Sequence, residues 1–416
     1  MESIEQAFGD LAGIKQWLYR FADTYTHCRI YDSNETEAAL QAGPYELLLA
    51  LGQKLKYKGS ASEQLRKAES SPWWKFISLN YGLISDADLP SYVYEPEYVF
   101  LIRRNTSKLK IINNGSDNTA FQHMLRAFRE QSVERPAQAP VQVQFTPATD
   151  KSEYLRKVDC IRNDIREGKY YEINYCIEFS APFRADSCLA YFSALNTLSR
   201  APFSAYVKHE NQNLLCSSPE RFLMKQGRRL LSQPIKGTNK RMPGKLNEIQ
   251  LEHLKTSEKE RAENVMIVDL VRNDLARVCL PGSIKVEELC GAYAYVSVNH
   301  LVSSISGVLN EDADLQAIFS ALYPMGSMTG APKTEVMKHI TLYEKSERGI
   351  YSGCIGYMAP DGDFDLNVVI RTLVYDREKA VISYKVGSAI TYDSNAEQEY
   401  EECLLKGSRM ASVFGN

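Results

Sequence analysis

The chain has 416 residues and a formal net charge of −3, and 44% of its residues are hydrophobic and 24% charged. This composition allows a sizeable core, and the small net charge gives no basic field for nucleic acid or an anionic membrane. No run of eighteen apolar residues predicts a transmembrane helix, and the first residues lack the pattern of a signal peptide. Nine scattered cysteines without a Cys-x-x-Cys spacing indicate reduced thiols. We therefore expect a cytoplasmic globular protein.

The first 135 residues carry few chemical signals. Apolar periodicity predicts helices over residues 5–21, 45–55 and 119–132, and strands over 92–103 and 109–111. The proline-containing segment 135–140 is the one obvious linker, and a short strand is expected over 141–145. We predict a variable N-terminal lobe, residues 1–135, integrated into one compound domain with a catalytic core of residues 150–416.

The pattern is sharper from residue 150 onwards. Helices are expected over 150–168, 252–278, 315–322, 333–345 and 393–410. Strands are expected over 170–180, 201–207, 213–216, 221–225, 228–233, 283–287, 300–308, 353–359, 364–375 and 379–386. Because the strands follow one another as hairpins and the helices fall between such runs, the pattern favours an α+β fold with antiparallel sheets over alternating βαβ units.

A single lysine stands in an unusual local setting. Lys236 lies between Pro234 and Gly237, two residues that restrict or reshape the backbone, and we expect a turn that holds its ammonium group in place. A lysine needs desolvation or a nearby cation to lose its proton and act as a nucleophile near neutral pH. An ordinary solvated lysine beside a turn is the alternative interpretation.

Two of the predicted helices each carry a pair of glutamates. Glu260 and Glu263 share one helical face, as do Glu399 and Glu402, because each pair is three residues apart. Like charges at this spacing repel, and burial would require a cation between them. Two converging pairs would give the oxygen-rich surroundings that Mg²⁺ prefers, whereas two solvated helix faces are the alternative.

One arginine interrupts an apolar stretch. Arg371 lies within residues 367–373, where its neighbours predict a strand. A buried guanidinium there requires an anionic partner, and a carboxylate held by two hydrogen bonds is the natural one. Tyr351 could supply a hydroxyl beside it, and a solvent-facing strand position is the alternative.

These features lie within six segments whose order resembles the chorismate-utilising enzymes. That family includes anthranilate synthase component I, aminodeoxychorismate synthase component I, isochorismate synthase and salicylate synthase. The segments are residues 218–222, 234–238, 263–275, 330–333, 348–353 and the helix that carries Glu399 and Glu402. The resemblance covers residues 150–416 and implies the anthranilate synthase component I-like fold, in which two packed, largely antiparallel β-sheets are flanked by helices.

The resemblance also implies roles for single positions. Glu263 and Glu402 match ligands of a Mg²⁺ cofactor that holds the ring carboxylate of chorismate, with Glu260 and Glu399 as supporting carboxylates. Arg371 and Tyr351 match the clamp on the enolpyruvyl carboxylate, and Glu220 matches the general acid for the departing C4 hydroxyl. The remaining expected substrate contacts are Lys406, Thr238, Ser327, His300 and Gly387.

Lys236 separates the branches of this family. Anthranilate synthases resemble Pro-Ile-Ala-Gly-Thr here and add ammonia directly at C2, whereas aminodeoxychorismate synthases carry a lysine that attacks C2 before ammonia adds at C4. Ser327 also resembles the second branch. Glu172 replaces the water-activating lysine of the isochorismate and salicylate synthases, although amine-using members more often carry glutamine there, and Ala389 stands at a usual glycine.

The resemblance therefore implies a subunit that aminates chorismate at C4 to 4-amino-4-deoxychorismate, for p-aminobenzoate and folate synthesis. Ammonia is expected from a separate glutamine amidotransferase. The alternatives are C2 amination with release of pyruvate, as in anthranilate synthase component I, and a non-catalytic partner subunit on the same fold. The N-terminal lobe has no Leu-Leu-Glu-Ser-like run, so we do not expect inhibition by tryptophan.

Overall fold

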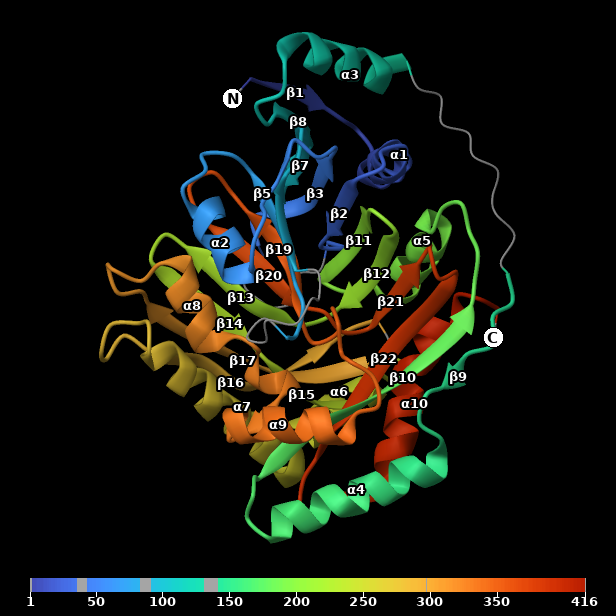
Figure 1. Cartoon of the computed structure of the whole chain (residues 1–416), viewed down its shortest axis with the longest axis vertical. Coiled ribbons are helices and arrows are strands. Elements are labelled where there is room, and N and C mark those ends of the chain that lie inside the picture. Colours follow the sequence, from blue (N-terminus) through green and yellow to red (C-terminus); the bar gives the residue numbers. More distant parts are fainter. Residues whose placement is uncertain (1, 36–42, 83–90, 131–140, 297, 416) are drawn as a thin grey trace.

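Two antiparallel β-sheets form the framework of the molecule, and helices pack around them (Figure 1). The computed structural model describes residues 2–35, 43–82, 91–130, 141–296 and 298–415. These sheets and helices confirm the predicted α+β class with two flanked, largely antiparallel sheets.

The larger sheet contains strands from both halves of the chain. Its spatial order is β1 (Ser3–Ala7), β8 (Lys108–Asn113), β7 (Tyr98–Arg103), β3 (Tyr45–Leu51), β2 (Cys28–Asp32), β11 (Phe203–His209), β12 (Gln212–Ser218), β21 (Thr372–Asp376), β22 (Val381–Ile390), β10 (Glu172–Pro182) and β18 (Gly330–Ala331), with β9 (Thr146–Pro147) beside β10.

The smaller sheet also combines early and late strands. Its order is β15 (Ile235–Lys240), β17 (Val298–Val308), β14 (Arg229–Gln233), β13 (Arg221–Gln226), β20 (Phe364–Val368), β19 (Cys354–Met358), β5 (Lys75–Leu79), β6 (Tyr92–Glu95) and β4 (Leu55–Lys56), with β16 (Lys285–Ala294) beside β17. The division of the chain into an N-terminal lobe and a core stays a prediction, and the expected linker over 135–140 lies outside the described residues.

The helices of the described chain differ in length and in position around the sheets. They are α1 (Leu11–Asp23), α2 (Ala61–Glu69), α3 (Asn118–Glu130), α4 (Lys151–Arg166), α5 (Leu189–Ser199), α6 (Leu246–Thr256), α7 (Glu258–Ala276), α8 (Leu315–Leu322), α9 (Lys333–Tyr343) and α10 (Ala396–Ser412), with the short 3₁₀ helix η1 (Gly326–Met328).

The N-terminal predictions were partly wrong. The segment 45–55 is not a helix, because its apolar run Leu47–Leu51 is buried in the sheet as β3; a short apolar run suits a buried strand as well as a helix. The predicted helix over 5–21 begins only at Leu11, after β1, where the Asp10 side chain accepts hydrogen bonds from the first turn. Residues 141–145 form no strand.

Two predicted elements of the core are interrupted in the structure. The long helix over 252–278 is two helices, α6 and α7, because Ser257 adopts an extended backbone and its side chain caps the second helix at Glu260. The long strand over 364–375 is likewise two strands. Arg371 has a φ of +52°, which ends extended structure, and β20 and β21 belong to different sheets.

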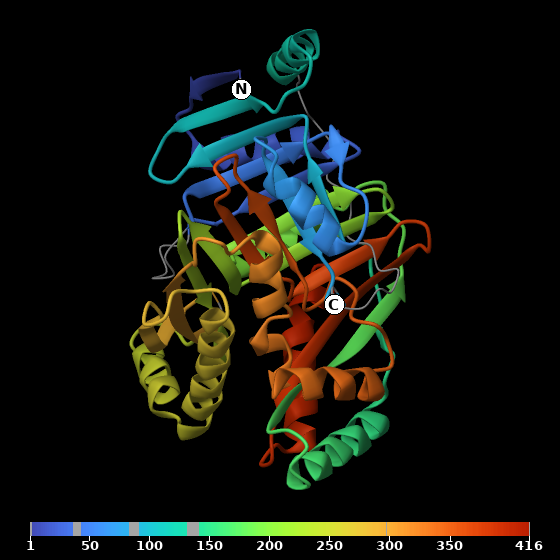
Figure 2. The ribbon, with the colours of Figure 1, turned by 60° about the vertical axis from the view of Figure 1, so that its left-hand side comes forward.

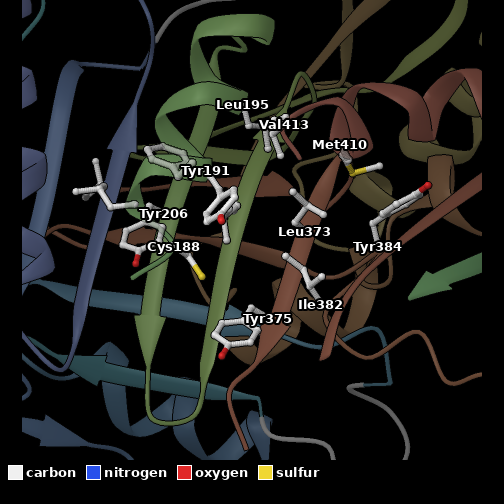
Figure 3. Packing of buried hydrophobic residues seen from close by; sticks show 14 of the residues in the cluster. Cys188, Tyr191, Leu195, Tyr206, Leu373, Tyr375, Ile382, Tyr384, Met410 and Val413 are labelled. Atoms are coloured by element: carbon white, nitrogen blue, oxygen red, sulfur yellow. The ribbon is translucent and has the colours of Figure 1, made fainter. Parts of the chain in front are cut away.

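A hydrophobic cluster fixes α5 and the end of α10 against the larger sheet (Figure 3). Leu195 of α5, Leu373 of β21 and Met410 of α10 are each at most 1% exposed. Tyr191, Tyr206, Ile382 and Tyr384 fill the space between these elements. α10 carries Glu399 and Glu402, two of the four glutamates of the candidate site, so this packing determines where those two lie.

All nine cysteines fall within the described residues and are free thiols. No helix in that part of the chain is both long enough and apolar enough to cross a bilayer. The cytoplasmic location stays a prediction.

Replacing Leu373 by alanine should lower the stability of the protein strongly. The side chain is fully buried between the sheet and two helices, so the substitution leaves a cavity and should cost about 2–5 kcal/mol. Urea denaturation followed by tryptophan fluorescence measures the change. Leu342→Ala is the matched control because Leu342 is 74% exposed, and it should change stability by less than about 0.5 kcal/mol. Equal effects of the two substitutions would contradict this packing.

Candidate active site

A cavity of about 730 Å³ opens between the two sheets, with α7 and β15 on one side and α10 and β22 on the other. Figure 2 shows the α6–α7 pair (olive) and α10 (red) on opposite sides of this region. Every site residue predicted from the sequence lines this one cavity. These residues are Glu220, Lys236, Thr238, Glu260, Glu263, His300, Ser327, Tyr351, Arg371, Gly387, Glu399, Glu402 and Lys406. Their roles stay predictions, but the structure brings them together.

Lys236 is held by a bulged strand and not by the expected turn. It belongs to β15, whose pairing with β17 shifts between Lys236 and Thr238, where Gly237 has a φ of +82°. A Cβ atom on Gly237 would lie 2.8 Å from Oε2 of Glu260. Glycine is therefore favoured by the backbone conformation, whereas the contact with Glu260 involves the movable end of that side chain.

The Lys236 ammonium group is buried and ion-paired. Its Nζ lies 2.7 Å from Oε1 of Glu172, and both side chains are less than 10% exposed. Burial acts to lower the pKa of Lys236, but the charges of Glu172, Glu263 and Glu220 outweigh it and raise the pKa above its ordinary value. The sequence left two ways for Lys236 to lose its proton, desolvation or a nearby cation. Desolvation alone does not deprotonate this lysine, because the surrounding carboxylates outweigh it.

Glu220 is a buried carboxyl group beside this lysine. Ser327 donates a hydrogen bond from Oγ to Oε1 of Glu220 over 2.6 Å. Burial raises the pKa of Glu220 to about 7, against the smaller opposing effects of Ser327 and Lys236. A carboxyl group that keeps its proton near pH 7 can act as a general acid.

Glu220 and Arg371 lie where the chain crosses from one sheet to the other. Glu220 is between β12 and β13, and Arg371 is between β20 and β21. The two crossings are adjacent, because the Val368 N–H donates to the Glu220 carbonyl and the Ser217 N–H donates to the Arg371 carbonyl. These irregular positions direct both side chains into the cavity.

Arg371 is suited to bind an anion. Its Nη1 donates to the Lys406 carbonyl over 3.4 Å, but within the described chain it forms no ion pair with a carboxylate. Burial lowers its pKa, since the charged guanidinium is poorly solvated. A ligand carboxylate reaching Arg371 and the neighbouring Tyr351 hydroxyl would compensate this charge.

The two glutamate pairs face the same cavity but are not a preformed metal cluster. Across the described residues, no three or more His, Cys, Asp or Glu side chains are arranged to hold a metal ion. Burial raises the pKa of Glu263 to about 7 and also raises that of Glu399, whereas the Glu402 side chain is 47% exposed and pairs with Lys406. The two pairs therefore line one cavity, and their binding of Mg²⁺ stays a prediction.

Polar side chains complete the cavity wall. Thr238 Oγ1 and His300 Nδ1 are 2.9 Å apart. Burial, together with the Arg371 charge, lowers the pKa of His300 to about 3, so its ring is neutral at physiological pH. Lys406 donates from Nζ to the Gly387 carbonyl over 2.8 Å. The methyl group of Ala389 also lines the cavity, where the resemblance implies glycine.

Several residues of the cavity wall were not predicted, among them Lys259 and Asn174. Lys259 interacts electrostatically with all four glutamates, and its position four residues before Glu263 is a signal that could have identified it. Asn174 lies two residues after Glu172 on β10, and its buried Oδ1 has no hydrogen-bond partner within the described chain. No signal in its local sequence distinguishes Asn174 from other polar strand residues.

The sequence profile of the chorismate binding enzymes matches residues 74–412. A protein named probable aminodeoxychorismate synthase, chloroplastic, from Oryza sativa is 41% identical over 65% of this chain and 30% of its own length. Aminodeoxychorismate synthase component 1 of Escherichia coli is 38% identical over 62% of this chain and 57% of its own length. The chain thus spans less than two thirds of either relative.

Solved structures agree on the fold. Anthranilate synthase component I from Streptococcus pneumoniae superimposes with a TM-score of 0.76 and covers 99% of this chain, and 92% of that protein is matched. Its sequence identity is 20%, so this likeness concerns the architecture alone.

Replacing Glu220 by glutamine should flatten the dependence of stability on pH. The folded-state pKa of about 7 lies above the ordinary 4.5, so the stability that this group contributes is complete below pH 4.5 and is lost as pH rises to 7. The Glu220→Gln variant should therefore lose less free energy of unfolding between pH 5 and 8, by at most about 3 kcal/mol.

Urea denaturation at both pH values measures this difference. Glu347→Gln is the control, because Glu347 is exposed. An unchanged pH dependence in the Glu220→Gln variant would show that Glu220 is ionised throughout this range.

Proposed function

Because the chain belongs to the chorismate binding enzymes, we propose that its cavity binds chorismate and that Lys236 directs amination to C4. The observation that carries this proposal is the lysine itself. It lines the cavity beside Glu220, at the position where the resemblance assigns alanine to anthranilate synthases and lysine to aminodeoxychorismate synthases. The relatives named aminodeoxychorismate synthase support the same branch.

Two groups of residues orient the substrate in this proposal. Arg371 and Tyr351 bind the enolpyruvyl carboxylate, since the guanidinium faces the cavity without a carboxylate partner. His300, Ser327 and Thr238 contact the ring and its hydroxyl group, while Lys406 and Gly387 lie near a bound carboxylate. Substrate held in this way lies over Lys236 and Glu220.

We further propose Mg²⁺ as the cofactor. The carboxylates of Glu263 and Glu402 would hold it, with Glu260 and Glu399 nearby, because Mg²⁺ binds through one or two carboxylates, waters and an anionic ligand and needs no closed protein cage. The bound ion would neutralise the ring carboxylate of chorismate. Raised pKa values at Glu260, Glu263 and Glu399 fit a site that gains stability from an added cation.

The proposed chemistry uses two side chains together. The Lys236 amine attacks C2 while Glu220 gives its proton to the C4 oxygen, which leaves as water instead of the poorer leaving group hydroxide. Ammonia then adds at C4, and the bond between C2 and the lysine nitrogen breaks. The product keeps its enolpyruvyl group, and Lys236 is regenerated.

Ammonia is proposed to come from a separate glutamine amidotransferase. The name of the Escherichia coli relative, component 1, implies a further component of that protein. The cysteines of this chain are structural in character, since eight of the nine are buried free thiols. An amidotransferase would therefore be another polypeptide or another part of a longer chain.

Lys236→Ala should abolish formation of the C4-amino product from chorismate, ammonium and Mg²⁺. Loss of the nucleophile should lower the rate at least about 10³-fold. Product analysis by mass spectrometry, with a pyruvate assay, distinguishes C4 amination from C2 amination, which releases pyruvate. Lys255→Ala is the control because Lys255 is an exposed lysine outside the cavity.

The same assay tests the alternatives. The native protein should yield a covalent adduct on Lys236 when ammonia is withheld, with an added mass equal to chorismate less one water. Undiminished C4 product from Lys236→Ala would refute the nucleophile role. Pyruvate and a C2-amino product would establish anthranilate synthase activity, and failure to consume chorismate would establish a non-catalytic partner.

Removal of Mg²⁺ should abolish the activity, and Glu263→Gln should raise the Mg²⁺ concentration for half-maximal rate by at least about 10-fold. The reason is the loss of one of the proposed anionic ligands. Titration of Mg²⁺ after treatment with a chelator measures the effect. Glu258→Gln is the matched control, since Glu258 is an exposed residue at the start of the same helix. Full activity in excess chelator would contradict the cofactor.

A further inference from the structure

We propose that Glu172 is a further catalytic residue, the base that accepts the proton that Lys236 must lose before its amine attacks the substrate. This role rests on the proposed function, because it concerns the activation of the Lys236 nucleophile.

The geometry of the pair supports a direct proton transfer. Glu172 Oε1 and Lys236 Nζ are 2.7 Å apart, a distance over which a proton can pass without an intervening water. Of the described carboxylates, Glu172 is the one within ion-pair distance of this nitrogen. Within the described chain, Glu220 and Glu263, the other acidic groups whose charges act on Lys236, form no ion pair with its Nζ.

Burial leaves the carboxylate of this pair incompletely hydrogen-bonded within the described chain. Glu172 is 1% exposed, and its second oxygen, Oε2, is buried without a hydrogen-bond partner. A buried carboxylate is costly when its lone pairs are incompletely satisfied. Moving the proton from Lys236 to Glu172 removes both charges at once, so a substrate that excludes water from the cavity favours the transfer.

The two neighbouring acids are committed to other tasks. Glu220 keeps its own proton near pH 7 and receives a hydrogen bond from Ser327, so it is a proton donor. Glu263 is the proposed metal ligand. Glu172 does not line the cavity, whereas Lys236 does, so the base lies behind the nucleophile and the amine lone pair is left to face the substrate.

The backbone holds Glu172 in this place. It pairs with Ala331 across β10 and β18, and a Cβ atom at Gly330 would lie 2.0 Å from the Glu172 carbonyl oxygen. Gly330 also has a φ of +147°, which side-chain-bearing residues rarely adopt. The segment Ser327–Ala331 therefore contacts Glu220 at one end and Glu172 at the other.

The steps balance. Glu172 takes a proton from the Lys236 ammonium, and the neutral amine forms the bond to C2 as the C4–O bond breaks and Glu220 releases its proton to form water. Ammonia adds at C4 and the C2–N bond breaks, which returns the neutral amine of Lys236. Glu172 gives the proton back to this amine, and Glu220 takes one from the new C4 ammonium group. The sum is chorismate plus ammonia giving aminodeoxychorismate plus water.

The decisive variant is Glu172→Gln, which keeps the size and a hydrogen-bond acceptor but cannot take up the proton. With chorismate and Mg²⁺ but no ammonia, adduct formation on Lys236 at pH 7 should slow by at least about 100-fold. The rate should recover as pH rises and solvent removes the proton of Lys236, and this recovery should begin below the ordinary lysine pKa of about 10.4, because loss of the Glu172 charge lowers the pKa of Lys236. The KM for chorismate should change little, because Glu172 does not line the cavity.

A parental rate and pH dependence in Glu172→Gln would overturn the proposal and leave Glu172 a positioning residue. Glu178→Gln is the matched control, since Glu178 lies on the same strand in an ion pair with Lys385 and should keep the parental pH dependence. If Glu172→Gln does not fold, Glu172→Asp replaces it. That variant keeps the acid at a longer distance and should slow adduct formation without shifting its pH dependence, and a shift would overturn the role.

Adduct formation by the native protein distinguishes failure of the proposed function from failure of the proposed role of Glu172. If the native protein forms no adduct while Lys236→Ala still aminates chorismate at C4, the covalent mechanism fails and the base has no task. If the native adduct forms and Glu172→Gln forms it with the native rate and pH dependence, the proposed function stands and the role of Glu172 alone is refuted.

Discussion

The buried ion pair between Lys236 and Glu172 is the constraint on which the rest of the site depends. Lys236 lies on β15 of the smaller sheet and Glu172 on β10 of the larger one, so the pair joins the two sheets beside the cavity. Removing one partner of such a pair leaves an uncompensated buried charge at a cost of about 3–5 kcal/mol. The ion pair therefore fixes the distance between the sheets at this point, and this distance determines where the cavity-lining residues lie.

Where the chain crosses from one sheet to the other, it places side chains in positions that regular strands cannot provide. A strand alternates its side chains between two faces, and the space between the sheets is filled mainly by such alternating residues. Glu220 and Arg371 stand instead at irregular positions between strands, one of them with a positive φ. Strain of this kind is retained where the surrounding structure determines it, and two adjacent crossings joined by backbone hydrogen bonds provide that support.

The sequence was sufficient to predict the α+β class and the residues that meet at the cavity, because short motifs of unusual composition contain them. It was not sufficient for the pairing of Lys236 with Glu172, since the two are far apart in the chain and meet only through sheet order. The break at Arg371 was also missed, because an uninterrupted apolar run predicts a single strand even where the chain passes from one sheet to the other. The raised pKa of Lys236 depends on how many carboxylates surround it, which only the tertiary structure determines.

The Ser327–Ala331 segment limits how such a site can diverge in evolution. It binds the Glu220 carboxyl group through Ser327 and the backbone of Glu172 through its last residues. A substitution that shifts this segment therefore displaces groups on both sides of Lys236 together, and neither can be adjusted alone. Divergence toward another nucleophile is then easier by exchanging side chains at positions 172 and 236 than by remodelling the backbone. In the proposed mechanism, the scaffold can remain constant while two side chains select the reaction.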